Sequence, residues 1–163
     1  MLDETAEARK QELLSLLGDV APTIDGLDLA AADAASRLAA AHPSDSPGMR
    51  RIRTLCEAGA QGDWLVPREA ADRVRFGRLS RDLKGYTVDC VLMEGTARGH
   101  THPRGEVTIG FAWEGHDPRF DGQPEGWTVH PPGSHHVPTV TGGRMLLVYL
   151  LPGGEVIWDS DSG

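Results

Sequence analysis

Histidines gather in one stretch of this 163-residue chain, and their spacing constrains the fold more than any other feature. Six of the seven histidines lie between residues 95 and 138. The stretch opens with a His-x-His pair, His100 and His102, and three residues separate this pair from Glu106. Side chains alternate between the two faces of a β-strand, so the two histidines share a face and Glu106 has the same parity.

A turn at residues 103–105, Pro-Arg-Gly, would let Glu106 reach back toward the histidines from the next strand. A later Pro-x-Gly-x-x-His segment supplies His136. Three imidazole nitrogens and one carboxylate oxygen suit a divalent ion. The spacing therefore predicts one metal site with the ligands His100, His102, Glu106 and His136. As isolated residues they could equally be ordinary surface or core side chains, but all four fit the two spacings together.

The other histidines of the stretch have less defined roles. His135 and His136 are adjacent, and adjacent strand residues point to opposite faces, so both should not bind the same ion. The Pro-x-Gly-x-x-His count selects His136, which leaves His135 outward-facing or at an interface. His130 could lie in the pocket or on the surface, and His116 is expected in an exposed loop.

These segments resemble the two sequence motifs of the cupins. Residues 95–106 match a glycine, His-x-His and Glu, and residues 126–136 match a glycine followed by Pro-x-Gly-x-x-His. The departures affect turns rather than the ligand positions: Trp113 stands where a glycine is usual, and Val140 replaces a common closing Asn. The resemblance implies a double-sheet β-barrel, or jelly roll.

More narrowly, residues 126–145 resemble bacterial 4-hydroxylaminobenzoate lyases. This resemblance implies a metal-dependent lyase that converts 4-hydroxylaminobenzoate to 3,4-dihydroxybenzoate and ammonia during nitroaromatic acid degradation. It implies one divalent transition ion, with Fe, Mn, Zn and Ni not distinguished, and a small aromatic acid as substrate. The ion would weaken the N–O bond as a Lewis acid. Glu106 and His136 are then the expected catalytic residues, Glu106 as a proton shuttle.

An aromatic acid needs a partner for its carboxylate and a wall for its ring. Arginine offers a bidentate partner, although most such arginines are solvated surface residues. Aromatic residues could line the pocket, although core packing is their more common role. The candidate substrate-binding residues are Arg78, Arg98, Arg104, Trp113 and Tyr149.

Length and composition exclude several classes of protein. The chain suits one domain with an appendage, and 39% apolar residues provide for a core. A net charge of −8 argues against a nucleic-acid partner. No apolar run is long enough to span a membrane, and the acidic N-terminus lacks the pattern of a signal peptide. We therefore expect a cytoplasmic protein whose two cysteines, Cys56 and Cys90, are buried reduced thiols.

The order of elements predicts an α+β fold, with a helical leader at residues 1–62 and a cupin barrel at residues 63–163. The leader is too small for a core of its own, so it should pack on the barrel or across a homodimer. Hydrophobic spacing, caps and breakers predict helices at 3–17, 28–41 and 46–58, with a chain break at Pro22. Strands are predicted at 64–66, 74–79, 86–93, 107–113, 127–130, 136–140, 145–151 and 156–158, with a loop at 115–126 and turns at 142–143 and 153–154.

Two rival functions stay open at this point. The same ligand set would suit iron in an oxygen-dependent cupin dioxygenase acting on a small aromatic or thiol substrate, and oxygen uptake would distinguish it. A non-enzymatic sensor or binding module would bind aromatic acids without turnover, although no DNA-binding helix with a basic face is recognisable.

Overall fold

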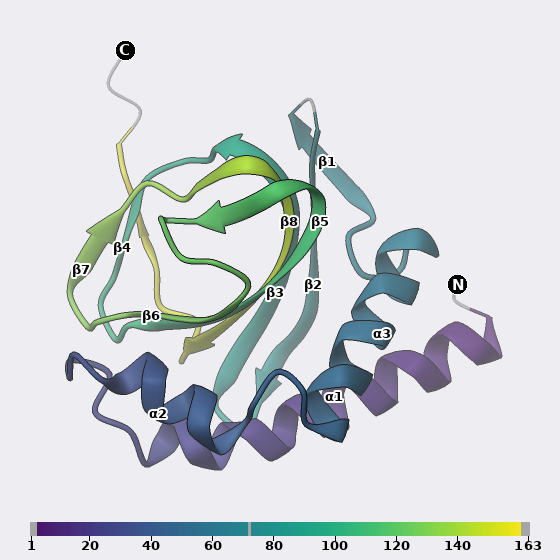
Figure 1. The fold of residues 1–163 in the computed structure, drawn as a ribbon, viewed down its shortest axis with the longest axis horizontal. Coiled ribbons are helices and arrows are strands. Elements are labelled where there is room, and N and C mark those ends of the chain that lie inside the picture. Colours follow the sequence, from purple (N-terminus) through teal and green to yellow (C-terminus); the bar gives the residue numbers. More distant parts are fainter. Residues whose placement is uncertain (1–2, 72, 161–163) are drawn as a thin grey trace.

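The computed structural model describes residues 3–71 and 73–160, and these form three helices followed by two antiparallel sheets (Figure 1). Residues 1–2 of the predicted helical leader and residues 161–163 of the predicted barrel lie outside the described residues. The helices are α1 (Glu4–Asp25), α2 (Ala34–Ala41) and α3 (Pro47–Gln61). The strands are β1 (Arg68–Ala71), β2 (Val74–Leu83), β3 (Tyr86–Thr96), β4 (His100–His102), β5 (Glu106–Phe120), β6 (Gly126–His130), β7 (Ser134–His136), β8 (Thr139–Pro152) and β9 (Ile157–Trp158).

The strands build a barrel from one large and one small sheet. The large sheet has the order β1-β2-β3-β8-β5-β6, and the small sheet has the order β7-β4-β9. Seen in Figure 1, the small sheet closes one side of a ring, and the large sheet, with β6 at its end, forms the rest. The α+β class and the double-sheet barrel predicted from the sequence are therefore confirmed.

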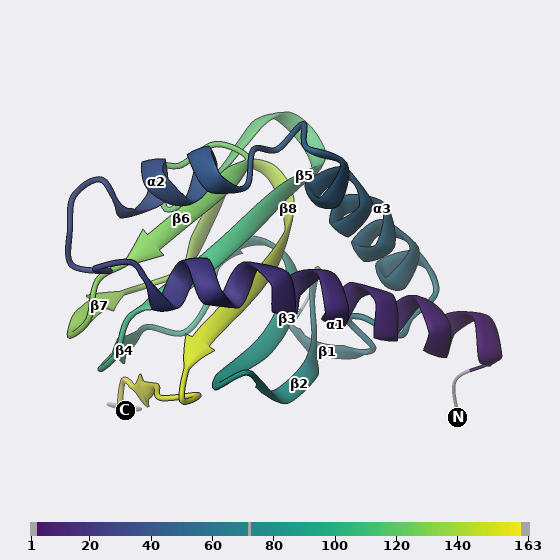
Figure 2. The same cartoon turned by 90° about the horizontal axis from the view of Figure 1, so that it is seen from below.

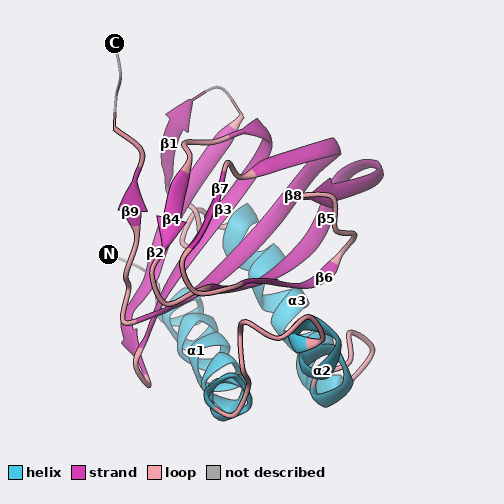
Figure 3. Ribbon diagram, turned by 90° about the vertical axis from the view of Figure 1, so that its left-hand side faces the viewer, coloured by secondary structure: helices cyan, strands magenta, loops and turns pink. Residues whose placement is uncertain are grey.

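All three helices lie on the outer face of the large sheet (Figures 2 and 3). Alternation along the strands sends one set of side chains toward the helices and the other set into the barrel. The outward set packs with the helices into the main core, which includes Leu13, Leu17, Ile52, Val88, Cys90, Leu146, Val148 and Leu150. A second, smaller cluster lines the interior and consists of Met93, Phe120, Val140, Met145, Leu147 and Tyr149.

The first helix is longer than predicted, because it passes through Pro22 and ends at Asp25. A proline inside a helix has no N–H for the carbonyl four residues earlier, here that of Gly18. The Lys84 ammonium, on the turn after β2, donates to that Gly18 oxygen at 2.9 Å. Burial continues past the proline as well, with Val20, Ala21 and Ile24 in the core. A tertiary contact and continued packing thus offset the local break.

The other helices keep their predicted positions with shifted ends. The second begins at Ala34 rather than residue 28, because the Asp28 carboxylate accepts from the Ala30 N–H at 3.0 Å and holds a turn there. The third begins where predicted, with the Ser46 hydroxyl accepting from the Met49 N–H at 3.4 Å. It runs on to Gln61 instead of stopping at residue 58.

Two predicted strands are wrong in detail. Residues 64–66 form no strand, because the N–H groups of Trp64 and Leu65 bond to the Gly59 carbonyl and close the end of α3. The strand that follows, β1, was not predicted. The predicted strand at 136–140 is divided, since β7 ends at His136 and β8 begins at Thr139.

The predicted loop at 115–126 and the predicted turn at 142–143 are also corrected. Strand β5 continues to Phe120 and pairs with β8, with residues 116–118 bulging out. Gly143 lies opposite Gly115, and a Cβ at Gly143 would clash with the Glu114 carbonyl. This glycine therefore allows two backbones to approach closely rather than making a turn.

Both cysteines are buried free thiols in α3 and β3, as predicted. No described helix has the length and apolar character needed to cross a membrane.

Candidate metal centre

Strand pairing brings the four predicted ligands together. His100 on β4 lies directly opposite His136 on β7, and His102 follows on the same face of β4. The turn at residues 103–105 closes with the Gly105 N–H bonded to the His102 carbonyl at 3.2 Å. Glu106, the first residue of β5, is thereby folded back against His102, as the sequence suggested.

The ligand atoms converge on one point inside the barrel. The Nε2 atoms of His100, His102 and His136 lie 2.9–3.1 Å from one another. Glu106 Oε2 lies 3.2 Å from His102 Nε2, and its Oε1 lies 4.0 Å from His136 Nε2. His102 is fully buried and Glu106 is 2% exposed, so solvent does not separate these groups. The cluster could hold a metal ion.

Hydrogen bonding on the far side of two rings shows that the cluster suits a cation. His100 Nδ1 lies 2.9 Å from the Arg98 carbonyl, and His136 Nδ1 lies 2.6 Å from the Asp121 carboxylate. Both partners only accept, so each Nδ1 carries the proton and each Nε2 presents a lone pair. Lone pairs facing each other at this distance repel, and a divalent ion between them would remove that repulsion. The residues therefore fit a metal with nitrogen and oxygen ligands.

Burial also favours the uncharged imidazoles that metal binding requires. Burial lowers the pKa of His102 to about 4. It also lowers the pKa of His100 below its usual value, although the hydrogen bond to Arg98 opposes this. Both rings are thus neutral at pH 7, the state in which imidazole binds a metal.

Asp121 was not among the sequence candidates, although it lies beside the ligands. Pairing of β5 with β8 resumes after the bulge and places Asp121 against Thr139, whose N–H donates to its Oδ1 at 2.9 Å. Burial alone would raise the pKa of Asp121, but hydrogen bonds from His130 and His136 bring that pKa below its usual range. The only local cue was an acidic residue in an expected loop.

His130, whose place was left open, lies beside the ligand cluster with a side chain that is mostly buried. Its Nε2 lies 2.9 Å from Asp121 Oδ2, and its Nδ1 lies 3.4 Å from Glu106 Oε1, close enough for an ion pair but not aligned as a hydrogen bond. Burial lowers the pKa of His130, but Asp121 and Glu106 outweigh this and raise it to about 9. His135 and His116 are exposed, His116 within β5 rather than a loop, and His135 Nε2 bonds to Asp159.

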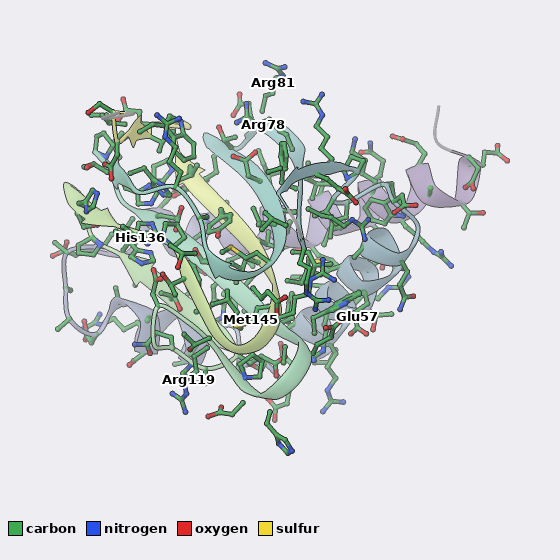
Figure 4. The ribbon with its side chains drawn as sticks, turned by 90° about the horizontal axis from the view of Figure 1, so that it is seen from above. Glu57, Arg78, Arg81, Arg119, His136 and Met145 are labelled. Atoms are coloured by element: carbon green, nitrogen blue, oxygen red, sulfur yellow. The ribbon has the colours of Figure 1, made fainter. Side chains whose placement is uncertain are left out.

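A cavity of about 990 Å³ lies inside the barrel beside the ligands. Three predicted substrate-binding residues line it: Arg78, Arg98 and Tyr149. Arg78 makes two bonds to Asp89, at 2.8 and 3.3 Å. Figure 4 labels Arg78 and Arg81, both on β2, and His136 on β7. The volume is at the upper end of the range that binds small organic ligands.

The two other predicted substrate-binding residues lie elsewhere. Arg104 is exposed beside Gly153, and Trp113 packs against the helix-side core. Neither is among the described residues that line the cavity. Trp158, which the sequence marked only as part of a final strand, does line it. Its ring centre lies 4.8 Å from that of His100, and the Arg98 guanidinium lies over its face at 5.7 Å.

Comparison with known sequences gives a consistent match. The family described as PnbB, 4-hydroxylaminobenzoate lyase, matches residues 17–158. A 4-hydroxylaminobenzoate lyase from Nocardioides sp. (strain LMS-CY) is 32% identical over 122 residues, which cover 67% of this chain and 71% of the relative.

Solved structures resemble the chain at low sequence identity. A chain from the crystal structures of the DMSP lyases RdDddP and RnDddQII superposes with a TM-score of 0.51 and 15% identity, covering 95% of this chain and 100% of that chain. An RmlC-like cupin protein from Ralstonia eutropha gives a TM-score of 0.45 and 12% identity, covering 60% of this chain and 66% of that chain. The DMSP lyase chain therefore shares the fold of this chain.

Proposed function

The chain belongs to the 4-hydroxylaminobenzoate lyase family, and on this premise we propose that it is a metal-dependent carbon–nitrogen lyase acting on 4-hydroxylaminobenzoate. The products are 3,4-dihydroxybenzoate and ammonia. The observation that carries the proposal is the convergence of three imidazole Nε2 atoms and one buried carboxylate beside a cavity of suitable size for an aromatic acid.

The reaction balances with one molecule of water and no external oxidant. The N–O bond breaks and oxygen is delivered to the neighbouring ring carbon, so the nitrogen is reduced while the ring is oxidised. The resulting quinone-imine-like ring then exchanges its nitrogen for the oxygen of water and releases ammonia. Nicotinamide and flavin are therefore not needed.

The proposed ligands are His100, His102, Glu106 and His136, and a divalent ion held by them would supply Lewis acidity toward the hydroxylamine oxygen. Glu106 also has a role of its own as a proton carrier. The Thr108 hydroxyl donates to Glu106 Oε1 at 3.1 Å, which leaves Oε2 facing His102 and the cavity. A buried carboxylate in this position can accept a proton from the substrate and return it to the departing nitrogen.

The cavity wall supplies the groups that an aromatic acid needs. Arg78 and Arg98 present guanidinium groups to the cavity and are the proposed partners of the substrate carboxylate. Tyr149 and Trp158 offer aromatic surface for the ring. Binding the remote carboxylate would fix the position of the hydroxylamino group relative to the metal ligands. This positioning would lower the entropic part of the activation barrier.

Product analysis with two neighbouring histidine variants tests this proposal. The wild-type protein, supplied with a divalent metal, should release one ammonia for each 3,4-dihydroxybenzoate formed. His136→Ala should lose this activity, and His135→Ala, which changes the exposed neighbour, should keep it. Release of the catechol without ammonia, or equal activity in both variants, would contradict the proposal.

A further inference from the structure

Asp121 occupies an unusual position, since one of its oxygens accepts from two histidines. Its Oδ2 lies 2.6 Å from His136 Nδ1 and 2.9 Å from His130 Nε2. Its other oxygen, Oδ1, accepts from the Thr139 N–H at 2.9 Å. The carboxylate is thereby fixed to the backbone of β8 on one side and holds two imidazole rings on the other.

The two histidines connect Asp121 to different metal ligands. His136 is itself a proposed ligand, and the bond to Asp121 keeps its proton on Nδ1 and its Nε2 lone pair toward the cluster. His130 lies between two carboxylates, with Nε2 at Asp121 and Nδ1 at 3.4 Å from Glu106 Oε1. The rings of His130 and His136 also pack against each other, with centres 3.9 Å apart.

From this geometry we propose that Asp121 is a positioning residue that orients two of the four ligands, His136 directly and Glu106 through His130. A carboxylate that accepts from a ligating histidine fixes the ring and makes it a better ligand. Here the Asp121 carboxylate also fixes His130, which lies beside the ligand Glu106. Asp121 touches neither the ion nor the substrate in this scheme, so its removal should act first on metal affinity.

The test is titration of metal-stripped full-length protein with Co²⁺, whose visible absorption reports both occupancy and ligand geometry. Asp121→Asn should weaken Co²⁺ binding by about 10- to 100-fold and alter the absorption bands. His130→Ala, which removes only the path to Glu106, should weaken binding less. The double variant should bind about as well as Asp121→Asn alone, because Asp121→Asn already removes the path from Asp121 through His130 to Glu106.

Asp117→Asn is the matched control, because this carboxylate lies on β5, a few residues before Asp121, and accepts from the Arg119 side chain rather than from a histidine of the cluster. It should bind Co²⁺ as the wild type does. Circular dichroism of the metal-free variants checks that each is folded. If Asp121→Asn does not fold, the same titration of His130→Ala tests the proposal. A Co²⁺ affinity of His130→Ala equal to that of the wild type would show that His130 does not orient Glu106, and would overturn the proposal.

This inference rests on the proposed metal site, and the experiment separates the two claims. A wild type that binds no Co²⁺ contradicts the metal site itself. A wild type that binds Co²⁺ with Asp121→Asn at the same affinity and with the same absorption bands overturns only the positioning role. Additive losses in the double variant would equally contradict the proposal that Asp121 acts on Glu106 through His130.

Discussion

His136 and His135 are adjacent in β7, yet they serve opposite faces of the small sheet: His136 Nε2 lies 2.9 Å from a nitrogen of the ligand cluster, and His135 Nε2 lies 2.9 Å from an exposed carboxylate. Because side chains alternate along a β-strand, His135 provides a matched control for substitutions of His136. Two residues of the same type, one position apart, differ in burial and in their partners.

The first prediction concerns metal content. Protein purified without chelator should contain close to one divalent transition ion per chain. Replacing His102 or His136 by Ala should remove most of it, because a site that loses one of four ligands binds far more weakly. His135→Ala should keep the wild-type content. Elemental analysis measures all four proteins, and full metal content in both ligand variants would refute the site.

The second prediction concerns the helical leader. Leu17 of α1 is fully buried in the core shared with the large sheet. Truncation to Ala should lower the free energy of unfolding by about 2–5 kcal/mol, as for other buried leucines. Ser15→Ala, at an exposed position of the same helix, should change it little. Urea denaturation provides the values. A monodisperse and fully active protein lacking residues 1–60 would show that this packing is dispensable.

The third prediction concerns alkaline pH. Burial raises the pKa of Cys56 to about 12 and places that of Cys90 well above its usual value. Above about pH 9 the unfolded chain loses thiol protons that the folded chain keeps, so stability falls as pH rises from there. Each thiol can contribute a slope of at most about 1.4 kcal/mol per pH unit. Cys56→Ala should therefore lose less stability between pH 8 and 10.5 than the wild type, as measured by urea unfolding.

The fourth prediction concerns the ring of the substrate. Trp158 is about half exposed, lines the cavity and makes an edge-to-face contact with the His100 ring. Trp158→Ala should weaken the binding of an unreactive analogue, 4-hydroxybenzoate, by a few-fold, which is the size of one aromatic contact. Trp113→Phe, on the helix side of the sheet, should bind it normally. Calorimetric titration distinguishes them, and equal affinities would exclude Trp158 from the binding surface.

Local patterns in the sequence predicted the parts of the fold and the site that depend on local geometry. Alternation placed His100 and His102 on one face, and the 103–105 turn returned Glu106 to them. The Ser46 cap marked the start of α3 for the same reason, since a cap acts within one turn.

The errors arose where distant residues decide the local structure. The helix passes Pro22 because Lys84, far along the chain, bonds to the carbonyl that the proline leaves unpaired. Asp121 reaches the ligand cluster only because β5 resumes its pairing with β8 after a bulge. Trp113 and Trp158 could not be ranked from sequence either, since the face of a bulged or terminal strand depends on its partner.

Turnover under strictly anaerobic conditions tests the central claim most directly. With 4-hydroxylaminobenzoate and the metal-loaded protein, ammonia and 3,4-dihydroxybenzoate should form at the same rate with and without oxygen, because the N–O bond supplies the oxidising equivalents. A binding module would bind the acid without forming either product. Turnover that stops when oxygen is removed, or that persists fully in metal-free protein, would contradict the proposed reaction.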